Sequence, residues 1–252
     1  MIEKIYIQDI VAIAKKAGKE IMDIYSKDFE VSYKQDNSPL TIADKNANRI
    51  IEEGLSNLLT NFPILSEEGK KTPYSERKNW DCFWLLDPLD GTKEFVKKNG
   101  EFTVNIALIQ KGDPVLGVVY APALDVCYWA KQGEGAFKDG RRIPLKSKNQ
   151  RKKYRIVASR SHMSNETKNF INSIKTSKEK ELVSVGSSLK ICLVAEGKAD
   201  IYPRLGPTME WDTGAAHAIA SEAGCAFSKY NNQGKFGYNK VELLNDWFIV
   251  SQ

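Results

Sequence analysis

Two carboxylates three residues apart mark the segment of this sequence best suited to chemistry. The apolar residues 84–86 lead into Asp87, and Asp90 follows after Pro88. Proline fixes its own φ angle and disfavours helix at the preceding residue, so we expect a buried strand that ends in an acidic turn. Neighbouring carboxylates repel each other unless a cation lies between them. The pair is therefore a candidate Mg²⁺ site, and a turn without metal is the alternative.

Further acidic residues lie at the ends of predicted strands and helices, where side chains can converge on one pocket. Glu67 and Glu68 follow a short strand, and Asp44 and Asp212 lie near helix starts. Asp44 could instead form a capping box with Thr41, and Asp212 could simply complement the helix dipole. Their joint occurrence favours a metal centre, because two metal ions can stabilise both the attacking and the leaving oxygen of a phosphoryl transfer.

Thr92 places a hydroxyl group directly after the acidic segment. A hydroxyl paired with a carboxylate such as Asp44 could orient and deprotonate a water molecule. The alternative is that Thr92 caps a helix that continues through residues 93–95. The two interpretations are compatible.

Several other kinds of chemistry are disfavoured. The only histidines are His162 and His217, which nearly excludes a His-rich zinc centre. Neither the Gly-x-Ser-x-Gly elbow of serine hydrolases nor the Gly-x-x-x-x-Gly-Lys-Ser/Thr phosphate loop is present.

The chain has 252 residues, 42% of them hydrophobic, which suits one large or two small globular domains. No run of ~18 apolar residues could span a membrane, and residues 1–5 lack the layout of a signal peptide. We therefore expect a cytoplasmic protein. Reduced thiols are favoured over disulfides or a zinc site, because the four cysteines are far apart in the sequence and form no C-x-x-C pair: Cys82, Cys127, Cys192 and Cys225.

The net charge of +5 is concentrated in residues 138–155, where Asp139 is the only acid. A solvated loop between two halves of the fold is the first interpretation of this basic stretch. A positive field that attracts a polyanionic substrate is the second, and it would also permit peripheral association with an anionic membrane surface. Nucleic acid is not expected as a partner, because the stretch lacks interleaved aromatic residues for base stacking.

The first half of the chain predicts two helices followed by a β-meander. Apolar residues recur every three or four positions over residues 8–25, and a second helix should run from near Thr41 to about Leu59. Short strands are expected at residues 64–65 and 83–86. Turn signals separate three β-rich runs, which should form an antiparallel meander: residues 102–109, 115–121 and 126–130.

The second half alternates strands and helices. We expect strands at residues 154–158, 182–185, 199–203, 225–227 and 247–250, with helices at 165–176, 188–196 and 212–223. The basic stretch separates a predicted N-terminal metal-site domain, residues 1–150, from a C-terminal domain, residues 151–252. This order indicates a layered α/β or α+β fold.

Three separated motifs resemble the signatures of the inositol monophosphatase superfamily. Residues 87–92 resemble its DPLDGT signature, Trp211 and Asp212 its second signature, and residues 66–68 its acidic strand end. The resemblance implies a layered αβαβα sandwich. Finer motifs resemble the 3'(2'),5'-bisphosphate nucleotidases of the CysQ type: residues 91–95, 186–190, 192–197, 202–204 and 206–208.

This resemblance implies a Mg²⁺-dependent, Li⁺-sensitive phosphomonoesterase. It would remove the 3'-phosphate of 3'-phosphoadenosine 5'-phosphate, a by-product of sulfate assimilation, to give AMP and phosphate. Asp44 and Thr92 would activate the water. Two or three Mg²⁺ ions would be held by Glu67, Asp87, Asp90, Asp212 and the carbonyl of Leu89. The substrate would contact some of the same residues and the second half of the chain: Glu67, Leu89, Asp90, Gly91, Thr92, His162, Ser187, Lys190, Arg204 and Asp212.

The resemblance leaves alternatives open. Inositol monophosphate or fructose 1,6-bisphosphate could be the substrate instead, and a non-catalytic nucleotide sensor could keep the same fold. Ser187 and Ser188 could form a helix N-cap, and Arg204 could be a surface charge. One departure from the family pattern is visible, because Gly214 and Ala216 exchange the usual Ala and Gly. We expect this exchange to affect helix packing more than Asp212.

Overall fold

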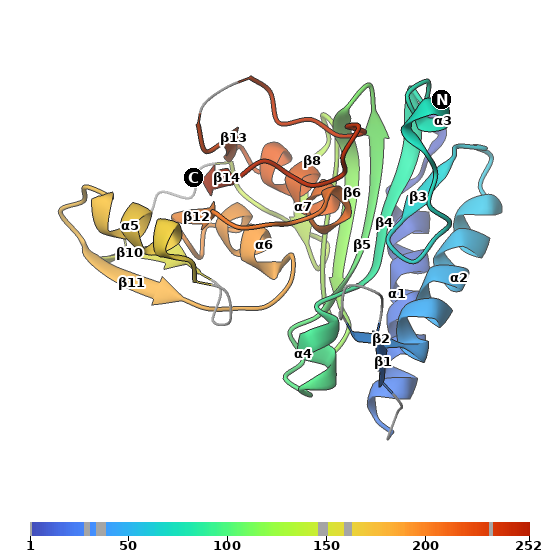
Figure 1. The fold of residues 1–252 in the computed structure, drawn as a ribbon, viewed down its shortest axis with the longest axis horizontal. Coiled ribbons are helices and arrows are strands. Elements are labelled where there is room, and N and C mark those ends of the chain that lie inside the picture. Colours follow the sequence, from blue (N-terminus) through green and yellow to red (C-terminus); the bar gives the residue numbers. More distant parts are fainter. Residues whose placement is uncertain (1, 28–30, 34–38, 146–150, 159–162, 232–233) are drawn as a thin grey trace.

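Two sheets alternate with three layers of helices (Figure 1). The structure, a computed structural model, describes residues 2–27, 31–33, 39–145, 151–158, 163–231 and 234–252. Helices α1 and α2 cover one face of a seven-stranded sheet, α6 and α7 lie between that sheet and a five-stranded sheet, and α5 covers the far side. The predicted αβαβα sandwich is thereby confirmed. No helix in the described ranges has the length and apolar character to cross a membrane.

The outer helical layer consists of α1 (Ile7–Tyr25) and α2 (Ile42–Ser56). Every third or fourth residue of α1 is fully buried, as the sequence periodicity predicts. Helix α2 ends three residues before the predicted Leu59, whose side chain is 95% exposed. Because this leucine is exposed, a longer helix would gain no hydrophobic burial from it.

The larger sheet has the order β3-β4-β5-β6-β7-β8-β9. Strands β3 and β4 are parallel, and the remaining neighbours are antiparallel, which confirms the predicted meander. Strands β8 and β9 were not predicted. The strands are β3 (Ile64–Ser66), β4 (Cys82–Asp90), β5 (Thr103–Gln110), β6 (Asp113–Ala121), β7 (Val126–Lys131), β8 (Gly135–Lys138) and β9 (Arg141–Arg142), with the short helices α3 (Tyr74–Arg77) and α4 (Thr92–Val96) between them.

Strand β5 shows why the strands of the meander have continuous apolar sequences. Val104, Ile106 and Leu108 belong to the core beneath α1 and α2. Ala107 and Ile109, on the opposite face, belong to the core shared with α6 and α7. Because successive side chains point to opposite faces, a strand covered on both sides must be apolar throughout.

The smaller sheet has the order β11-β10-β12-β14-β13, with β11, β10 and β12 parallel and the other pairs antiparallel. Its strands are β10 (Lys153–Val157), β11 (Glu179–Val183), β12 (Ile201–Arg204), β13 (Ala226–Lys229) and β14 (Phe248–Ser251), and its helices are α5 (Asn165–Ser173), α6 (Leu189–Ala195) and α7 (Glu210–Glu222). A 3-10 turn, η1 (Ile2–Lys4), and a two-stranded pair, β1 (Val31–Tyr33) with β2 (Pro39–Thr41), complete the described elements.

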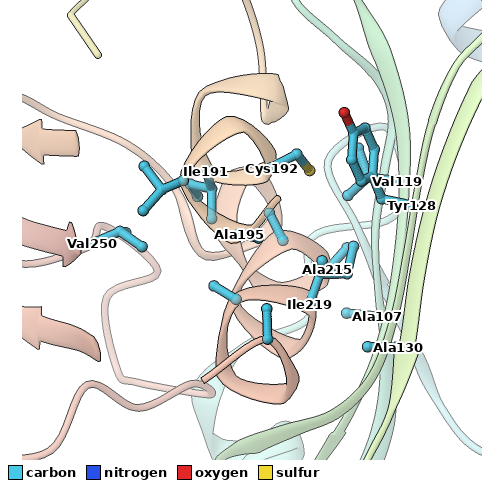
Figure 2. Close-up of a cluster of buried hydrophobic side chains, with 14 of the residues drawn as sticks. Ala107, Val119, Tyr128, Ala130, Ile191, Cys192, Ala195, Ala215, Ile219 and Val250 are labelled. Carbon is cyan, nitrogen blue, oxygen red and sulfur yellow. The ribbon is translucent and has the colours of Figure 1, made fainter. Parts of the chain in front are cut away.

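Helix α7 packs directly on the larger sheet although it comes from the second half of the chain. Figure 2 shows Ala215 and Ile219 of α7 beside Ala107 and Ala130 of that sheet. A Cβ atom on Gly117 of β6 would overlap the backbone carbonyl of Ala215, so only glycine permits this close approach. Both halves of the chain therefore share one hydrophobic core.

The Gly–Ala exchange seen in the sequence lies in this contact. A Cβ atom at Gly214 would stand 2.9 Å from Leu85 Cδ2 and 3.3 Å from the Ala107 Cβ atom. The first distance is shorter than ordinary van der Waals contact, so an alanine here requires Leu85 to move. The exchange thus acts at the packing surface between α7 and strands β4 and β5.

Candidate active site

Strand β4 is longer than the sequence predicts and includes both carboxylates, Asp87 and Asp90. The prediction of an acidic turn at residues 87–90 was wrong, because β4 continues to Asp90. Asp87 pairs with Asn105 and Asp90 with Thr103, so three steps along β4 oppose two along β5. This bulge supplies one extra residue, and prolines are tolerated at bulges. Without it, residues three apart would face opposite sides of the sheet.

Helix α7 brings a third carboxylate to the same point. One carboxylate oxygen each from Asp87, Asp90 and Asp212 lies within 4.8 Å of the others. Asp212 also forms a capping interaction, because its Oδ2 accepts a hydrogen bond from the Met209 amide at 2.8 Å. Asp212 thus both caps its helix and lies in the three-aspartate group, and its role as a metal ligand stays a prediction.

The electrostatics of this group favour a bound cation. Burial raises the pKa of Asp87 well above its usual value, and the negative charges of Glu67, Asp90 and Asp212 raise it further. Burial, followed by the charge of Asp90, raises the pKa of Asp212 to about 8. Buried carboxylates that repel one another are stabilised by a divalent cation, and an all-oxygen donor set suits Mg²⁺. The residues present therefore fit the metal that the sequence predicts.

Glu67 adjoins this group at the end of β3. Its amide donates to the Leu86 carbonyl at 3.1 Å, and its side chain forms a hydrogen bond with Asp87 that helps to raise the Asp87 pKa. Among the described residues, the 4.8 Å group itself contains only the three aspartates. Glu67 as a metal ligand stays a prediction, and so does the carbonyl of Leu89.

Asp44 and Thr92 meet as the sequence suggests. Oδ2 of Asp44 accepts hydrogen bonds at 2.7 Å from both the amide and the hydroxyl of Thr41, which is the capping interaction. Oδ1 accepts from the Thr92 hydroxyl at 3.2 Å. Burial raises the pKa of Asp44 to about 6. Asp44 therefore forms the capping interaction with one carboxylate oxygen and contacts Thr92 with the other, and its role in activating a water stays a prediction.

Thr92 is the first residue of α4, so the expectation that it caps this helix was wrong. The cap is Gly91, at a φ of +94°. A Cβ atom there would lie 3.2 Å from the Glu101 carbonyl and would be strained at this φ, which explains the glycine. Besides Asp44, the Thr92 hydroxyl can donate to the Leu89 carbonyl at 3.3 Å. Binding of a phosphate by the Gly91 and Thr92 amides stays a prediction.

A cavity of about 340 Å³ joins these acids to residues of the second half. Asp90, Gly91 and Asp212 line one part of it, and Ser187, Lys190 and Arg204 line another. Burial lowers the pKa of Lys190, although the carboxylate of Asp90 acts in the opposite direction. The cavity thus brings together six of the predicted metal and substrate residues from both halves of the chain, whereas Glu67, Asp87, Leu89 and Thr92 are not among its lining residues.

Two of the substrate residues present polar atoms without a partner in the described part of the chain. The buried hydroxyl of Ser187 and the buried Nε of Arg204 make no hydrogen bond there. The Arg204 guanidinium also donates to the Pro207 carbonyl at 2.6 Å, which holds it in place. Buried polar atoms without partners are costly, so these atoms are suited to receive a ligand.

The histidines, the cysteines and the basic stretch are the remaining features that the sequence analysis considered. His162 lies outside the described residues. His217 is buried, its Nδ1 is 2.9 Å from the Tyr238 hydroxyl, and burial lowers its pKa to about 3. The four cysteines are free thiols, as predicted. In the basic stretch, Arg141 and Arg142 are exposed on β9, and residues 146–150 lie outside the described ranges.

Sequence reasoning missed two residues that hold Asp90. The Ser188 amide and hydroxyl lie 2.6 and 2.7 Å from Oδ2 of Asp90. Asn105 is buried behind them and donates to the Ser188 hydroxyl at 2.8 Å. A signal for Asn105 was present, since it is a polar residue within an otherwise apolar strand. Ser188 had two signals, its place before a predicted helix and its position within the motif at residues 186–190, and neither indicated a contact with Asp90.

Comparison with known proteins decides the family. The model of the inositol monophosphatase family matches residues 2–249. The chain belongs to this family. Among its relatives, the inositol monophosphatase-family protein CysQ from Bacteroides thetaiotaomicron has a crystal structure that superimposes with a TM-score of 0.87 at 47% identity, covering 97% of this chain and 96% of that one.

Two curated inositol monophosphatase relatives carry a more specific description. A 3'(2'),5'-bisphosphate nucleotidase CysQ from Salmonella typhimurium is 49% identical over 249 residues, covering 97% of this chain and 99% of its own. The 3'(2'),5'-bisphosphate nucleotidase CysQ of Escherichia coli K12 is 44% identical with the same coverage. Both matches extend over nearly the whole chain.

The raised carboxylate pKa values predict a pH-dependent stability of the metal-free protein. Because the pKa of Asp212 is about 8 when folded and 3.8 otherwise, the folded state retains a proton that the unfolded chain has lost. This contribution to stability is present at low pH and is lost as the pH rises through 8. With chelator present, we expect a lower melting temperature at pH 8 than at pH 6.5.

Two controls isolate the aspartate in this measurement. Asp212→Asn should show a smaller difference between the two pH values, and Mg²⁺ in place of chelator should also reduce it. His217 acts in the opposite direction, because its pKa is lowered on folding and the unfolded histidine still loses its proton as the pH rises above 6.5. Equal melting temperatures of the metal-free protein at both pH values would contradict the assignment.

Proposed function

We propose that this chain is a Mg²⁺-dependent 3'(2'),5'-bisphosphate nucleotidase that hydrolyses the 3'-phosphate of 3'-phosphoadenosine 5'-phosphate to AMP and phosphate. The observation that carries the proposal is one cavity with acidic and cationic parts. Asp90 and Asp212 line it together with Lys190 and Arg204. The names of relatives that are 44–49% identical over nearly the full chain support the same activity.

Asp87, Asp90 and Asp212 would hold Mg²⁺, together with Glu67 and the carbonyl of Leu89, and we propose two or three ions. When bound, such ions polarise phosphoryl oxygens and lower the pKa of bound water. The chain's own contribution is to place carboxylates from β4 and α7 at one point. The bulge in β4 is the local feature that makes this placement possible.

Asp44 and Thr92 would orient the attacking water. The Thr92 hydroxyl donates to Asp44, so its oxygen lone pairs remain available to accept a hydrogen bond from water. Asp44 has a pKa of about 6, close to neutral pH, which suits the transfer of a proton. Its other oxygen is fixed by Thr41, so the carboxylate keeps its orientation.

Lys190, Arg204 and Ser187 would bind the second phosphate and the ribose. Charge-assisted hydrogen bonds to phosphate are stronger than neutral ones, and Lys190 is buried. An inositol monophosphate has only the scissile phosphate and would leave these cations unused. We therefore favour the nucleotide bisphosphate over an inositol monophosphate, and the names of the relatives support it over fructose 1,6-bisphosphate.

The deciding experiment compares phosphate release from 3'-phosphoadenosine 5'-phosphate, inositol 1-phosphate and fructose 1,6-bisphosphate. Each substrate is assayed with Mg²⁺, with Mg²⁺ plus Li⁺, and with chelator. The expected result is a strong preference for the nucleotide that is lost with chelator and reduced by Li⁺. Preference for another substrate would overturn the nucleotide assignment, and no release from any substrate would favour a non-catalytic sensor.

Asp44→Asn should reduce kcat by about 10²- to 10⁴-fold, the usual contribution of a general base. Asparagine retains the size of the side chain but cannot accept the proton. Asp9→Asn is a matched control, because Asp9 is also an acid in the first turn of a helix, at the exposed start of α1. Steady-state kinetics that show equal kcat values for the two variants would exclude the proposed role of Asp44.

Membrane association and cellular location have less support than the enzymatic activity. The exposed Arg141 and Arg142 belong to the basic stretch, and this stretch is the support for peripheral binding to an anionic membrane. Such binding stays a prediction, as does the cytoplasmic location.

A further inference from the structure

We propose that Ser188 is a positioning residue of the metal centre, one that fixes Asp90 of β4 relative to the start of α7. This inference rests on the proposed function, because it assumes that Asp90 and Asp212 hold a divalent cation. It assigns to Ser188 a role that does not require contact with substrate. Ser187 and Ser188 both line the cavity, but of the two only Ser187 has a hydroxyl without a hydrogen-bond partner in the described part of the chain.

Ser188 contacts both elements that carry the carboxylates. It is 3% exposed and directly precedes α6. Its amide donates to Asp90 Oδ2 at 2.6 Å, and its hydroxyl lies 2.7 Å from the same oxygen. The hydroxyl is also 2.8 Å from the backbone carbonyl of Asp212. One side chain thus joins a strand of the larger sheet to the first turn of α7.

The hydrogen bonds leave one oxygen of Asp90 available. Within the described residues, every hydrogen bond to Asp90 goes to Oδ2: two from Ser188 and two longer ones of 3.4 Å, from Thr103 and Asn105. Oδ1 therefore remains for a cation. Outer-shell hydrogen bonds of this kind orient carboxylate ligands and affect metal affinity.

Asn105 fixes the direction of the Ser188 hydroxyl. Its side-chain amide donates to Ser188 Oγ at 2.8 Å, so the serine oxygen is an acceptor in that contact. The single hydroxyl proton can then go only to Asp90 or to the Asp212 carbonyl. Alanine at position 188 would remove this link and leave the buried Asn105 donor without its closest partner.

The same segment holds a strained residue against the cavity. Ser187 has a φ of +51°, in the left-handed region that is unfavourable for a non-glycine residue. The hydrogen bonds of Ser188 help to offset this strain. The start of α6 therefore links a substrate contact, Ser187, to the carboxylate group through adjacent residues.

The test is Mg²⁺ binding by the purified full chain, measured by calorimetric titration without substrate. Ser188→Ala should weaken Mg²⁺ binding by about 10-fold or more, the usual effect of losing an outer-shell contact. Ser188→Thr keeps the hydroxyl and should restore most of the affinity. Ser164→Ala is the matched control, because Ser164 is also a serine at a helix N-terminus and its hydroxyl donates to the Leu205 carbonyl.

Weakened binding in Ser188→Ala, rescue in Ser188→Thr and wild-type affinity in Ser164→Ala would support the proposal. A dissociation constant for Ser188→Ala within about twofold of wild type, or an equal loss in Ser164→Ala, would overturn it. If Ser188→Ala does not fold, Asn105→Ala tests the same link, and unchanged Mg²⁺ binding there would also overturn the proposal. Failure of the proposed function would appear separately, as wild-type protein that binds Mg²⁺ but releases no phosphate from the nucleotide.

Discussion

Asp87→Asn is expected to abolish phosphate release and to leave the fold intact. Asp87 is 1% exposed and belongs to the three-carboxylate group. A bound divalent cation contributes several kcal/mol to transition-state stabilisation, so its loss should reduce kcat by about 10³-fold or more. Asparagine has nearly the same shape and removes a carboxylate that its neighbours repel. In chelator, the variant should therefore melt at the same temperature as wild type or higher.

Circular dichroism and thermal unfolding measure the fold, and phosphate release measures turnover. Asp81→Asn is the matched control, since Asp81 immediately precedes β4 and is exposed. It should retain wild-type turnover. An Asp87→Asn enzyme that still turns over at a rate comparable with wild type would show that Asp87 is not a metal ligand.

Lys190→Met is expected to reduce kcat/KM for the nucleotide bisphosphate far more than for a substrate with a single phosphate. Lys190 lines the same cavity as Asp90 and Asp212, and its burial makes a hydrogen bond to a phosphate strong. Loss of a charged hydrogen bond costs about 1.5–3 kcal/mol, which corresponds to about 10- to 100-fold in kcat/KM. Methionine keeps the length and the apolar stem of the side chain.

The comparison substrate is 3'-AMP, which carries the scissile phosphate but no 5'-phosphate. Lys198→Met is the control, because Lys198 is a largely exposed lysine just beyond α6, paired with Glu196 at 3.2 Å. That variant should act on both substrates as wild type does. Equal losses on both substrates in Lys190→Met would mean that Lys190 acts on the scissile phosphate or on the fold.

The sequence predicts the layers well because their signals are local. The periodicity of α1 and the apolar runs of β5, β6 and β7 follow from burial on one face of a helix or on both faces of a sheet. The capping box of Thr41 and Asp44 likewise needs only neighbouring residues. For the same reason most boundaries in the meander and the second half are close to those predicted, although β11 begins three residues before the strand predicted at 182–185 and α5 ends three residues before the predicted end at 176.

Errors arose where two distant segments meet. The turn predicted at residues 87–90 is a bulged strand because β5 supplies hydrogen-bond partners on the far side of Pro88. Thr92 is not the cap of α4 because its hydroxyl is directed to Asp44, 48 positions earlier. The role of Ser188 depends on Asp90 and Asp212, which lie on elements of both halves. No local pattern contains such information.

The candidate site residues were found for a different reason. Acidic side chains at the ends of elements are costly to bury, so their types and positions indicate chemistry even before they are placed in space. The structure places Asp87, Asp90 and Asp212 together and brings Lys190 and Arg204 to the same cavity. Asn105 carried a similar signal, a polar residue within an apolar strand, and it was overlooked.

The position of α7 on the larger sheet has a consequence for synthesis on the ribosome. The face of that sheet bearing Leu85, Ala107 and Val119 stays uncovered until the chain has been made as far as Glu222. A nascent chain that already contains the complete seven-stranded sheet therefore exposes a broad apolar surface, which favours aggregation or capture by chaperones. Asp212 is also absent until then, so the nascent protein has no complete carboxylate group and should be unable to act on nucleotides before it is almost finished.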